Sequence, residues 1–131
     1  MIKAVEKLLK GNGDYFYFAF RVLAGLMFAQ HGAQKLLGWF GGNQVELMSL
    51  FGLAGVIELF GGIMIATGLF TQIIALIGGA EMIYAFATVH LPKGWIPIMN
   101  GGELAALYFA AFLVLMTKGS GKWALENLLR K

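Results

Sequence analysis

The apolar run at residues 15–37 is long enough to cross a bilayer, since about 20 mostly apolar residues suffice. The run nevertheless contains three basic side chains, Arg21, His31 and Lys35. Counting in helical steps of three and four residues places all three on one face of a helix. A charge that faces lipid near the bilayer centre costs roughly 2.5–3.5 kcal/mol. These side chains should therefore face protein or water, and the rest of the chain must supply their partners.

The composition is that of a membrane protein. Of the 131 residues, 59% are hydrophobic and only 13% are charged, whereas a soluble domain has roughly a quarter charged residues. The chain has no cysteine, which excludes disulfides, thiol redox chemistry, iron–sulfur ligation and haem attachment through a CxxCH motif. We therefore expect an integral membrane protein that forms a single domain over residues 1–131.

Four apolar segments are separated by residues that favour turns. Almost no loop separates the second segment from the third, so these two should form an antiparallel hairpin of helices. Both terminal segments mix basic and apolar residues as short helices in the membrane interface do. The predicted fold is all-α: a polytopic, four-transmembrane-helix bundle with short interfacial helices at both termini. The predicted spans are at about residues 15–37, 47–69, 71–90 and 102–117.

Basic residues are distributed unevenly between the two predicted sides of the membrane. In the loops opposite the termini Lys93 is the single basic residue, with Lys35 at the end of a span. The positive-inside rule places both termini in the cytoplasm, and an even number of spans agrees. We expect a multi-pass protein of the bacterial cytoplasmic (inner) membrane, with a lipid bilayer rather than nucleic acid as the partner of its net positive charge. The basic residues of the termini are Lys3, Lys7, Lys10, Lys118, Lys122, Arg130 and Lys131.

Two glutamates fall near the middle of predicted spans, Glu58 in the second and Glu81 in the third. A carboxyl group at this depth must be protonated, paired or in contact with water. Glu58 lies four residues before Gly62, on a stripe of small residues where another helix can approach closely. We therefore expect both glutamates to face the bundle interior and to approach the first span between Arg21 and His31.

A second group of polar residues should lie in the outer half of the membrane. Within it, His31 and Lys35 are one helical turn apart and Glu103 begins the fourth span, so these three are expected to meet. His90 is nine residues from Glu81 and would face away from it on an ideal helix, so both serve one site only if the helix ends early. The candidate intramembrane polar cluster comprises Arg21, His31, Lys35, Glu58, Glu81, His90, Asn100 and Glu103.

Several stretches of the sequence resemble a known family. Residues 31–42 read HGAQKLLGWFGG, which is similar to the HGxxKLxGxFGG signature of DoxX-type membrane proteins. Residues 55–62 and 68–71 resemble the second helix of that family, and residues 90–104 resemble the outer loop and fourth helix of one large subgroup. The resemblance covers about residues 18 to 126. It implies a four-helix inner-membrane protein, and some members of this family belong to quinone-linked oxidoreductases such as thiosulfate:quinone oxidoreductase.

The resemblance implies a DoxX-type subunit of a redox-linked membrane complex, with a polar cluster that contacts a quinone or relays protons. Other membrane or peripheral redox subunits would then be its partners, in an oligomer or hetero-complex. One alternative is a purely structural subunit that docks and stabilises a larger complex, its buried charges fixing helix packing. A second alternative is a pathway for protons or a small solute. No intrinsic cofactor is expected, and a quinone is the ligand that the resemblance suggests.

Each candidate residue also has a structural interpretation. Glu58 and Glu81 could accept protons or contact a quinone, or they could form a buried ion pair that fixes helix packing. His31 and Lys35 could hold a quinone carbonyl, or Lys35 could extend to the interface while His31 donates to a carbonyl. His31 and His90 alone are weak evidence for haem, which is not expected, and no metal site is predicted. The chain has no P-loop, HExxH or nucleophile elbow, so a self-contained enzyme is not expected and catalytic residues are unknown.

Overall fold

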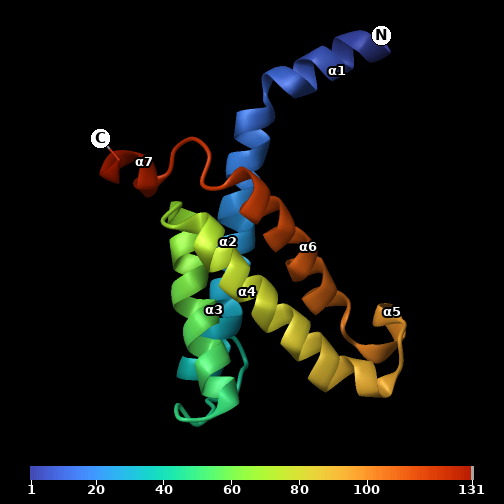
Figure 1. Ribbon diagram of the computed structural model, residues 1–131, viewed down its shortest axis with the longest axis vertical. Coiled ribbons are helices and arrows are strands. Elements are labelled where there is room, and N and C mark those ends of the chain that lie inside the picture. Colours follow the sequence, from blue (N-terminus) through green and yellow to red (C-terminus); the bar gives the residue numbers. More distant parts are fainter. Residues whose placement is uncertain (131) are drawn as a thin grey trace.

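The computed structural model describes residues 1–130, and over this range the chain is helical with no strand, as predicted (Figure 1). Four helices are long: α2 (Gly13–Leu37), α3 (Leu50–Thr67), α4 (Thr71–Ala85) and α6 (Glu103–Lys118). The shorter ones are α1 (Ile2–Gly11), α5 (Pro97–Asn100) and α7 (Leu125–Leu129). A π-helical turn (Phe86–His90) and a 3₁₀ turn (Leu91–Lys93) follow α4 directly.

The long helices lie close to the four predicted apolar segments. By length and composition, two helical stretches of residues 1–130 could cross a bilayer: Leu50–Thr67, with a mean hydropathy of 1.9, and Thr71–Lys93, with 1.6. Neither α2, with 25 residues, nor α6, with 16 residues, is among these two. The helical segments are therefore as predicted, while their arrangement as four spans stays a prediction.

Helices α2 and α3 form a tightly packed antiparallel pair. Small residues make this close approach: a Cβ added to Gly62 of α3 would lie 2.8 Å from the Cα of Ala29 on α2. A Cβ added to Gly32 of α2 would lie 2.6 Å from the Cα of Leu59 on α3. Neither glycine can carry a side chain unless the two backbones separate. The predicted stripe of small residues through Gly62 therefore lies at a helix–helix contact.

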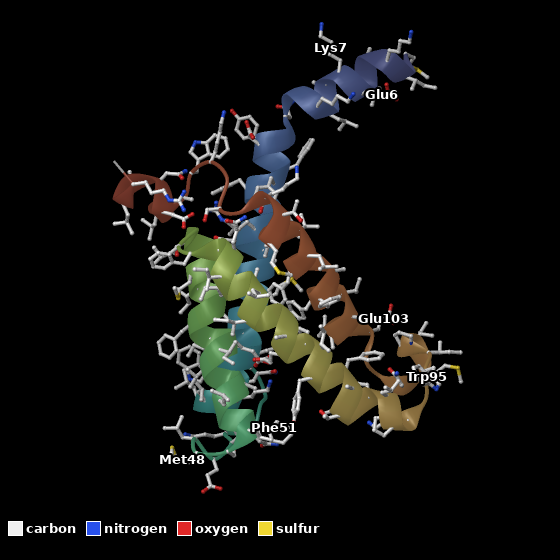
Figure 2. All side chains as sticks on the ribbon, in the orientation of Figure 1. Glu6, Lys7, Met48, Phe51, Trp95 and Glu103 are labelled. Atoms are coloured by element: carbon white, nitrogen blue, oxygen red, sulfur yellow. The ribbon has the colours of Figure 1, made fainter. Side chains whose placement is uncertain are left out.

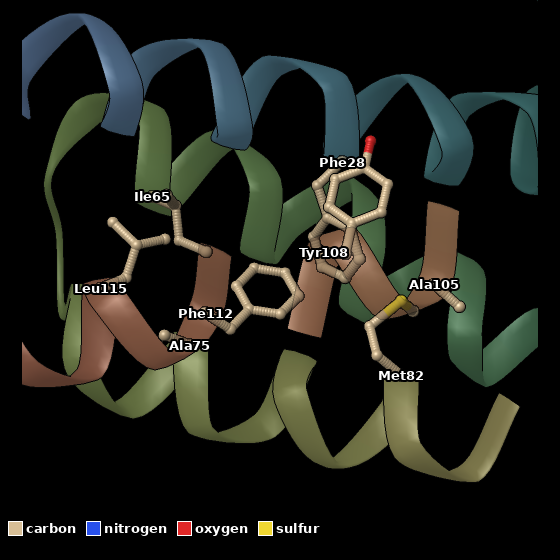
Figure 3. Packing of buried hydrophobic residues seen from close by; sticks show 8 residues of the cluster. All are labelled: Phe28, Ile65, Ala75, Met82, Ala105, Tyr108, Phe112 and Leu115. Atoms are coloured by element: carbon tan, nitrogen blue, oxygen red, sulfur yellow. The ribbon is translucent and has the colours of Figure 1, made fainter. Parts of the chain in front are cut away.

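Helices α4 and α6 form the second antiparallel pair, and the aromatic core fills the space between the two pairs. The ring of Phe112 on α6 packs against Gly78 of α4 and lies 4.9 Å from the Phe28 ring on α2, centroid to centroid. Figure 3 shows these rings together with Ile65, Met82 and Leu115. Because α6 contributes Phe112 and its neighbours Tyr108 and Leu115, its buried face follows the three-and-four spacing of a helix.

The two pairs diverge toward one end of the molecule. In Figure 1, α4 and α6 slope away from α2 and α3 toward the end that carries α5. At the other end the turn between α3 and α4 is short, and Gly68 adopts a left-handed φ of 77° there. A Cβ on Gly68 would lie 2.9 Å from the Cα of Ala124, so the C-terminal segment packs directly on this turn. The molecule is therefore closed at the end bearing both termini.

Large apolar side chains cover the outside of the long helices. Leu53, Ile73 and Leu107, for example, are 56%, 60% and 61% exposed. Figure 2 shows the labelled Phe51, Met48 and Trp95 at the periphery, away from the packed interior. Such extensive apolar exposure is typical of a surface that contacts lipid. Helix α1 buries none of its residues and projects from the bundle, so the predicted terminal helix is present while its position in the membrane interface stays a prediction.

Candidate functional site

An ion pair joins α2 to α3 in the half of the bundle where the helix pairs diverge. The Lys35 ammonium donates to both carboxylate oxygens of Glu58, at 2.6 and 2.7 Å. The Glu58 side chain is only 4% exposed and that of Lys35 is 28% exposed. Gly55, one turn before Glu58, lets the helices approach here, because a Cβ at that position would lie 3.1 Å from the Lys35 Cβ. The small residues of α3 thus bring the two charges together.

Glu81 of α4 adds a second carboxyl group beside Glu58. Both Glu81 oxygens are buried, and neither has a hydrogen-bond partner among the described residues. We refer to Lys35, Glu58 and Glu81 as the charged cluster. One ammonium beside two carboxyl groups leaves room for one proton or one hydrogen-bonding ligand in this cluster.

A cavity of ≈ 240 Å³ adjoins the charged cluster between the two helix pairs. Its walls are mostly apolar, and its polar lining comes from Lys35, Glu58, Tyr108 and two histidines. A mainly apolar cavity with a few convergent polar groups is the usual form of a small-molecule site. We call it the outer cavity; its lining residues are Phe28, His31, Lys35, Glu58, Met82, Ala85, His90, Gly101, Leu104, Ala105 and Tyr108.

Tyr108 of α6 is the site residue that the sequence interpretation missed. Its side chain is buried, and its hydroxyl has no hydrogen-bond partner within residues 1–130. The ring lies edge-on to the His31 ring, with centroids 5.7 Å apart, and 5.4 Å from the Phe28 ring (Figure 3). A tyrosine in the middle of an apolar helix, at helical spacing from Phe112, was the available signal. Buried tyrosine hydroxyls normally find a partner, so this hydroxyl suits a ligand in the cavity.

His90 lines the same cavity because the helix changes its winding. The α-helical part of α4 ends at Ala85, and the π-helical turn that follows has more residues per turn than an α-helix. This turn rotates His90 toward the outer cavity, which an ideal helix would not do. The His90 Nδ1 lies 3.3 Å from the backbone oxygen of Asn100. Asn100 itself is buried and fixes the loop, donating to the Gly94 carbonyl at 2.9 Å and accepting from the backbone N–H of Gly102 at 2.7 Å.

Arg21 lies apart from the other candidates. Its guanidinium is buried and donates to four backbone carbonyls, three of them in the C-terminal segment: Ala66 (3.4 Å), Ser120, Lys122 (3.2 Å) and Trp123 (3.1 Å). The prediction that Glu58 approaches α2 between Arg21 and His31 is therefore wrong. Glu58 pairs with Lys35, which lies further along α2. Backbone carbonyls, rather than carboxylates, accept from the two terminal nitrogens of the arginine, while its buried Nε has no hydrogen-bond partner among the described residues. This arrangement fastens residues 120–123 to the closed end of the bundle.

Glu103 also lies outside the cluster. Its side chain is exposed, and Figure 2 shows it pointing away from the bundle. Glu103 occupies the first turn of α6, where a carboxylate interacts favourably with the positive end of the helix dipole. The sequence predicts that His31, Lys35 and Glu103 meet. In the structure, His31, Lys35 and Tyr108 line the outer cavity together, and Glu103 does not. Among residues 1–130 no three His, Asp or Glu side chains are grouped so that they could hold a metal ion.

Comparisons with known proteins agree with the resemblance seen in the sequence. The sequence profile of the DoxX family matches residues 16–91. A Haemophilus influenzae protein, named only as an uncharacterized protein, is 41% identical over 120 residues, which are 86% of this chain and 90% of that protein. A Bacillus subtilis (strain 168) protein with the printed name "Putative oxidoreductase CatD" is 30% identical over 118 residues, which are 85% of this chain and 84% of that protein. No solved structure matches the chain.

Proposed function

Since this chain belongs to the DoxX family, we propose that it is a small integral-membrane subunit of a redox-linked assembly whose outer cavity holds the headgroup of a quinone. The Bacillus subtilis relative has the printed name "Putative oxidoreductase CatD", and this name supports the redox association. In this proposal the four long helices cross the bacterial cytoplasmic membrane with both termini in the cytoplasm. The outer cavity then opens in the outer half of the bilayer.

The observation that carries the proposal is Tyr108, which lines the outer cavity and whose buried hydroxyl has no partner among the described residues. A quinone carbonyl accepts hydrogen bonds, and a tyrosine hydroxyl can donate one. Phe28, Met82 and Leu104 provide apolar walls for the flat ring. The residues present therefore fit a quinone headgroup, with Tyr108 and His31 as its polar contacts and the charged cluster next to it.

A quinone supplies the chemistry of taking up two electrons and two protons when it is reduced. The chain's own residues would orient the ring, exclude water with the aromatic core, and hold a proton. Glu81 suits the last role, because both of its oxygens are buried without a hydrogen-bond partner among the described residues. Electron donors would belong to partner subunits, since the chain has no cysteine for iron–sulfur ligation or thiol chemistry.

The Lys35–Glu58 ion pair favours a second candidate function. Its carboxylate is satisfied at both oxygens, and a fully satisfied buried pair can serve to fix the register of two helices. In that case the chain would stabilise a larger membrane complex without binding a quinone. The two candidates differ in whether the outer cavity binds a ligand.

The experiment compares Tyr108→Phe with the matched variant Tyr84→Phe, whose ring is 57% exposed on α4. The probe is the tailless 2,3-dimethoxy-5-methyl-1,4-benzoquinone, and binding to the detergent-purified protein is measured by calorimetry. Loss of one hydrogen bond of about 1 kcal/mol should weaken binding by roughly fivefold in Tyr108→Phe alone. Equal binding by both variants would contradict the assignment of Tyr108. Absence of binding to the unmodified protein would favour the structural candidate.

A further inference from the structure

We propose, resting on the quinone site above, that the groove between α2 and α6 holds the tail of an isoprenoid quinone, which enters the outer cavity sideways from the bilayer. The tail would lie outside the headgroup site, and the ligand would arrive between α2 and α6. It assigns a function to a surface that the headgroup site leaves unused.

The groove has a volume of ≈ 240 Å³ and lies between α2 and α6, where Leu23 and Leu107 are exposed. Its lining is apolar apart from Tyr108, and it contains no charged side chain. The groove and the outer cavity share Leu104 and Tyr108. From there the groove continues along α6 to Ala111 and along α2 from Met27 to Phe20. A seven-residue helical length is about 10 Å, which suits the first units of an isoprenoid chain.

The shared residues fix which end of a ligand would lie where. Apart from Tyr108, which borders both spaces, hydrogen-bonding and charged groups line only the cavity side, while the groove side is bounded by exposed apolar side chains such as Leu23 and Leu107. Leu104 is 45% exposed and stands between the two spaces, so a change in its rotamer can widen the passage. An amphiphile with a polar head and an apolar chain matches this division, with its head at Tyr108 and its chain between α2 and α6.

A second apolar groove, between α4 and α6, also adjoins the cavity, because it shares Met82 and Ala105 with it. Both shared side chains are buried, at 6% and 9% exposure. The π-helical turn after α4 and the residue before α6 are also tightly packed at this end, where a Cβ on Gly102 would lie 2.7 Å from the Phe86 ring. The seam between α4 and α6 is therefore closed beside the cavity. The route between α2 and α6, which belong to different helix pairs, is the one that the packing favours.

The test uses the full chain in lipid nanodiscs and a quinone that carries a diazirine in the first isoprenoid unit of its tail. After illumination, mass spectrometry identifies the labelled residues. Labelling is expected at Leu107, Ala111 and Met27, and an excess of the tailless benzoquinone should suppress it. Ala111→Phe fills the α2–α6 groove, and Ala106→Phe is its matched control, since Ala106 lines the α4–α6 groove instead. The first variant should lower labelling and tailed-quinone affinity about tenfold, and the second should not.

Each outcome separates the tail site from the headgroup site. Labelling at Ile83 and Ala87 that the tailless quinone suppresses would place the tail in the α4–α6 groove and overturn this inference, while the headgroup proposal stands. Labelling spread over all lipid-facing residues and not suppressed would mean ordinary lipid contact, which also overturns it. If Ala111→Phe weakens tailless and tailed quinones equally, the variant has altered the headgroup site and the groove is not the tail site. If the tailless quinone does not bind the unmodified protein, both proposals fail.

Discussion

Lys35 and Glu58 form a two-pronged ion pair across the α2–α3 interface, with the Lys35 Nζ 2.6 Å from Glu58 Oε1 and 2.7 Å from Oε2. The carboxylate is almost completely removed from solvent, so its negative charge depends on this one lysine. Such a pair contributes little net free energy when intact, but it is expensive to break on one side.

Lys35→Met should therefore destabilise the protein, because it leaves the Glu58 carboxylate buried without its cation. A loss of about 3 kcal/mol is expected, and the double variant Lys35→Met/Glu58→Gln should recover most of it. Thermal unfolding in detergent, followed by circular dichroism, measures both. Lys122→Met is the control, since its pair with Asp14 at 3.0 Å is well exposed on both sides and should matter little. A double variant as unstable as the sum of its two single variants would contradict the coupling.

Gly62→Leu should disrupt the α2–α3 pair, because the Cβ alone would lie 2.8 Å from the Cα of Ala29. The helices would have to separate along their length, at a cost of about 3 kcal/mol or more. The neighbouring variant Ile63→Leu changes a 46% exposed side chain and should leave the melting temperature nearly unchanged. Similar melting temperatures for the two variants would show that Gly62 does not lie at a close helix contact.

Arg21→Gln should release the C-terminal segment while leaving the long helices folded. An amide cannot replace the charge-assisted hydrogen bonds to Ser120, Lys122 and Trp123, and each such bond contributes about 1.5–3 kcal/mol net of the competing bonds to water. Hydrogen exchange over residues 119–130 should accelerate markedly. Arg130→Gln is the matched control, because that side chain is 73% exposed and its ion pair within residues 1–130 is an i,i+4 contact with Glu126. Unchanged exchange in Arg21→Gln would show that other contacts hold the segment.

The orientation of the chain is tested by single cysteines, since the sequence has none of its own. A cysteine at Lys93, in the exposed outer loop, should react with a membrane-impermeant maleimide in intact spheroplasts. A cysteine at Lys122 should react only after lysis. The reverse pattern would mean that the termini are outside.

The helices could be predicted from the sequence because apolar runs and turn residues are local signals. The span predicted at residues 71–90 corresponds to α4 and the π-helical turn, which ends at His90. The winding of that turn could not be predicted, since a π-helical turn depends on how the helix packs rather than on composition. His90 consequently reaches the outer cavity although ideal helical spacing places it on the far side of Glu81.

The charged residues were easier to find than their partners. Their cost in lipid predicts that Arg21 and Lys35 have hydrogen-bond acceptors inside the protein, and both have them. Charge pairing suggested glutamates for Arg21, but its acceptors are backbone carbonyls, which every residue has and no sequence pattern marks. Tyr108 was missed for a related reason: a tyrosine in an apolar helix looks like packing until its neighbours are known to leave the hydroxyl unsatisfied.

The contacts of Arg21 also make the order of synthesis matter. Its acceptors in the C-terminal segment are 99–102 positions later in the chain, so at about 5–20 residues per second the ribosome delivers them at least several seconds after the arginine. During that interval the first long helix carries a cation that lacks its three acceptors in the C-terminal segment. We expect membrane proteases to distinguish finished from unfinished molecules by this arginine. In pulse–chase labelling, a chain that stops after Gly119 should be degraded faster than one that continues through Trp123.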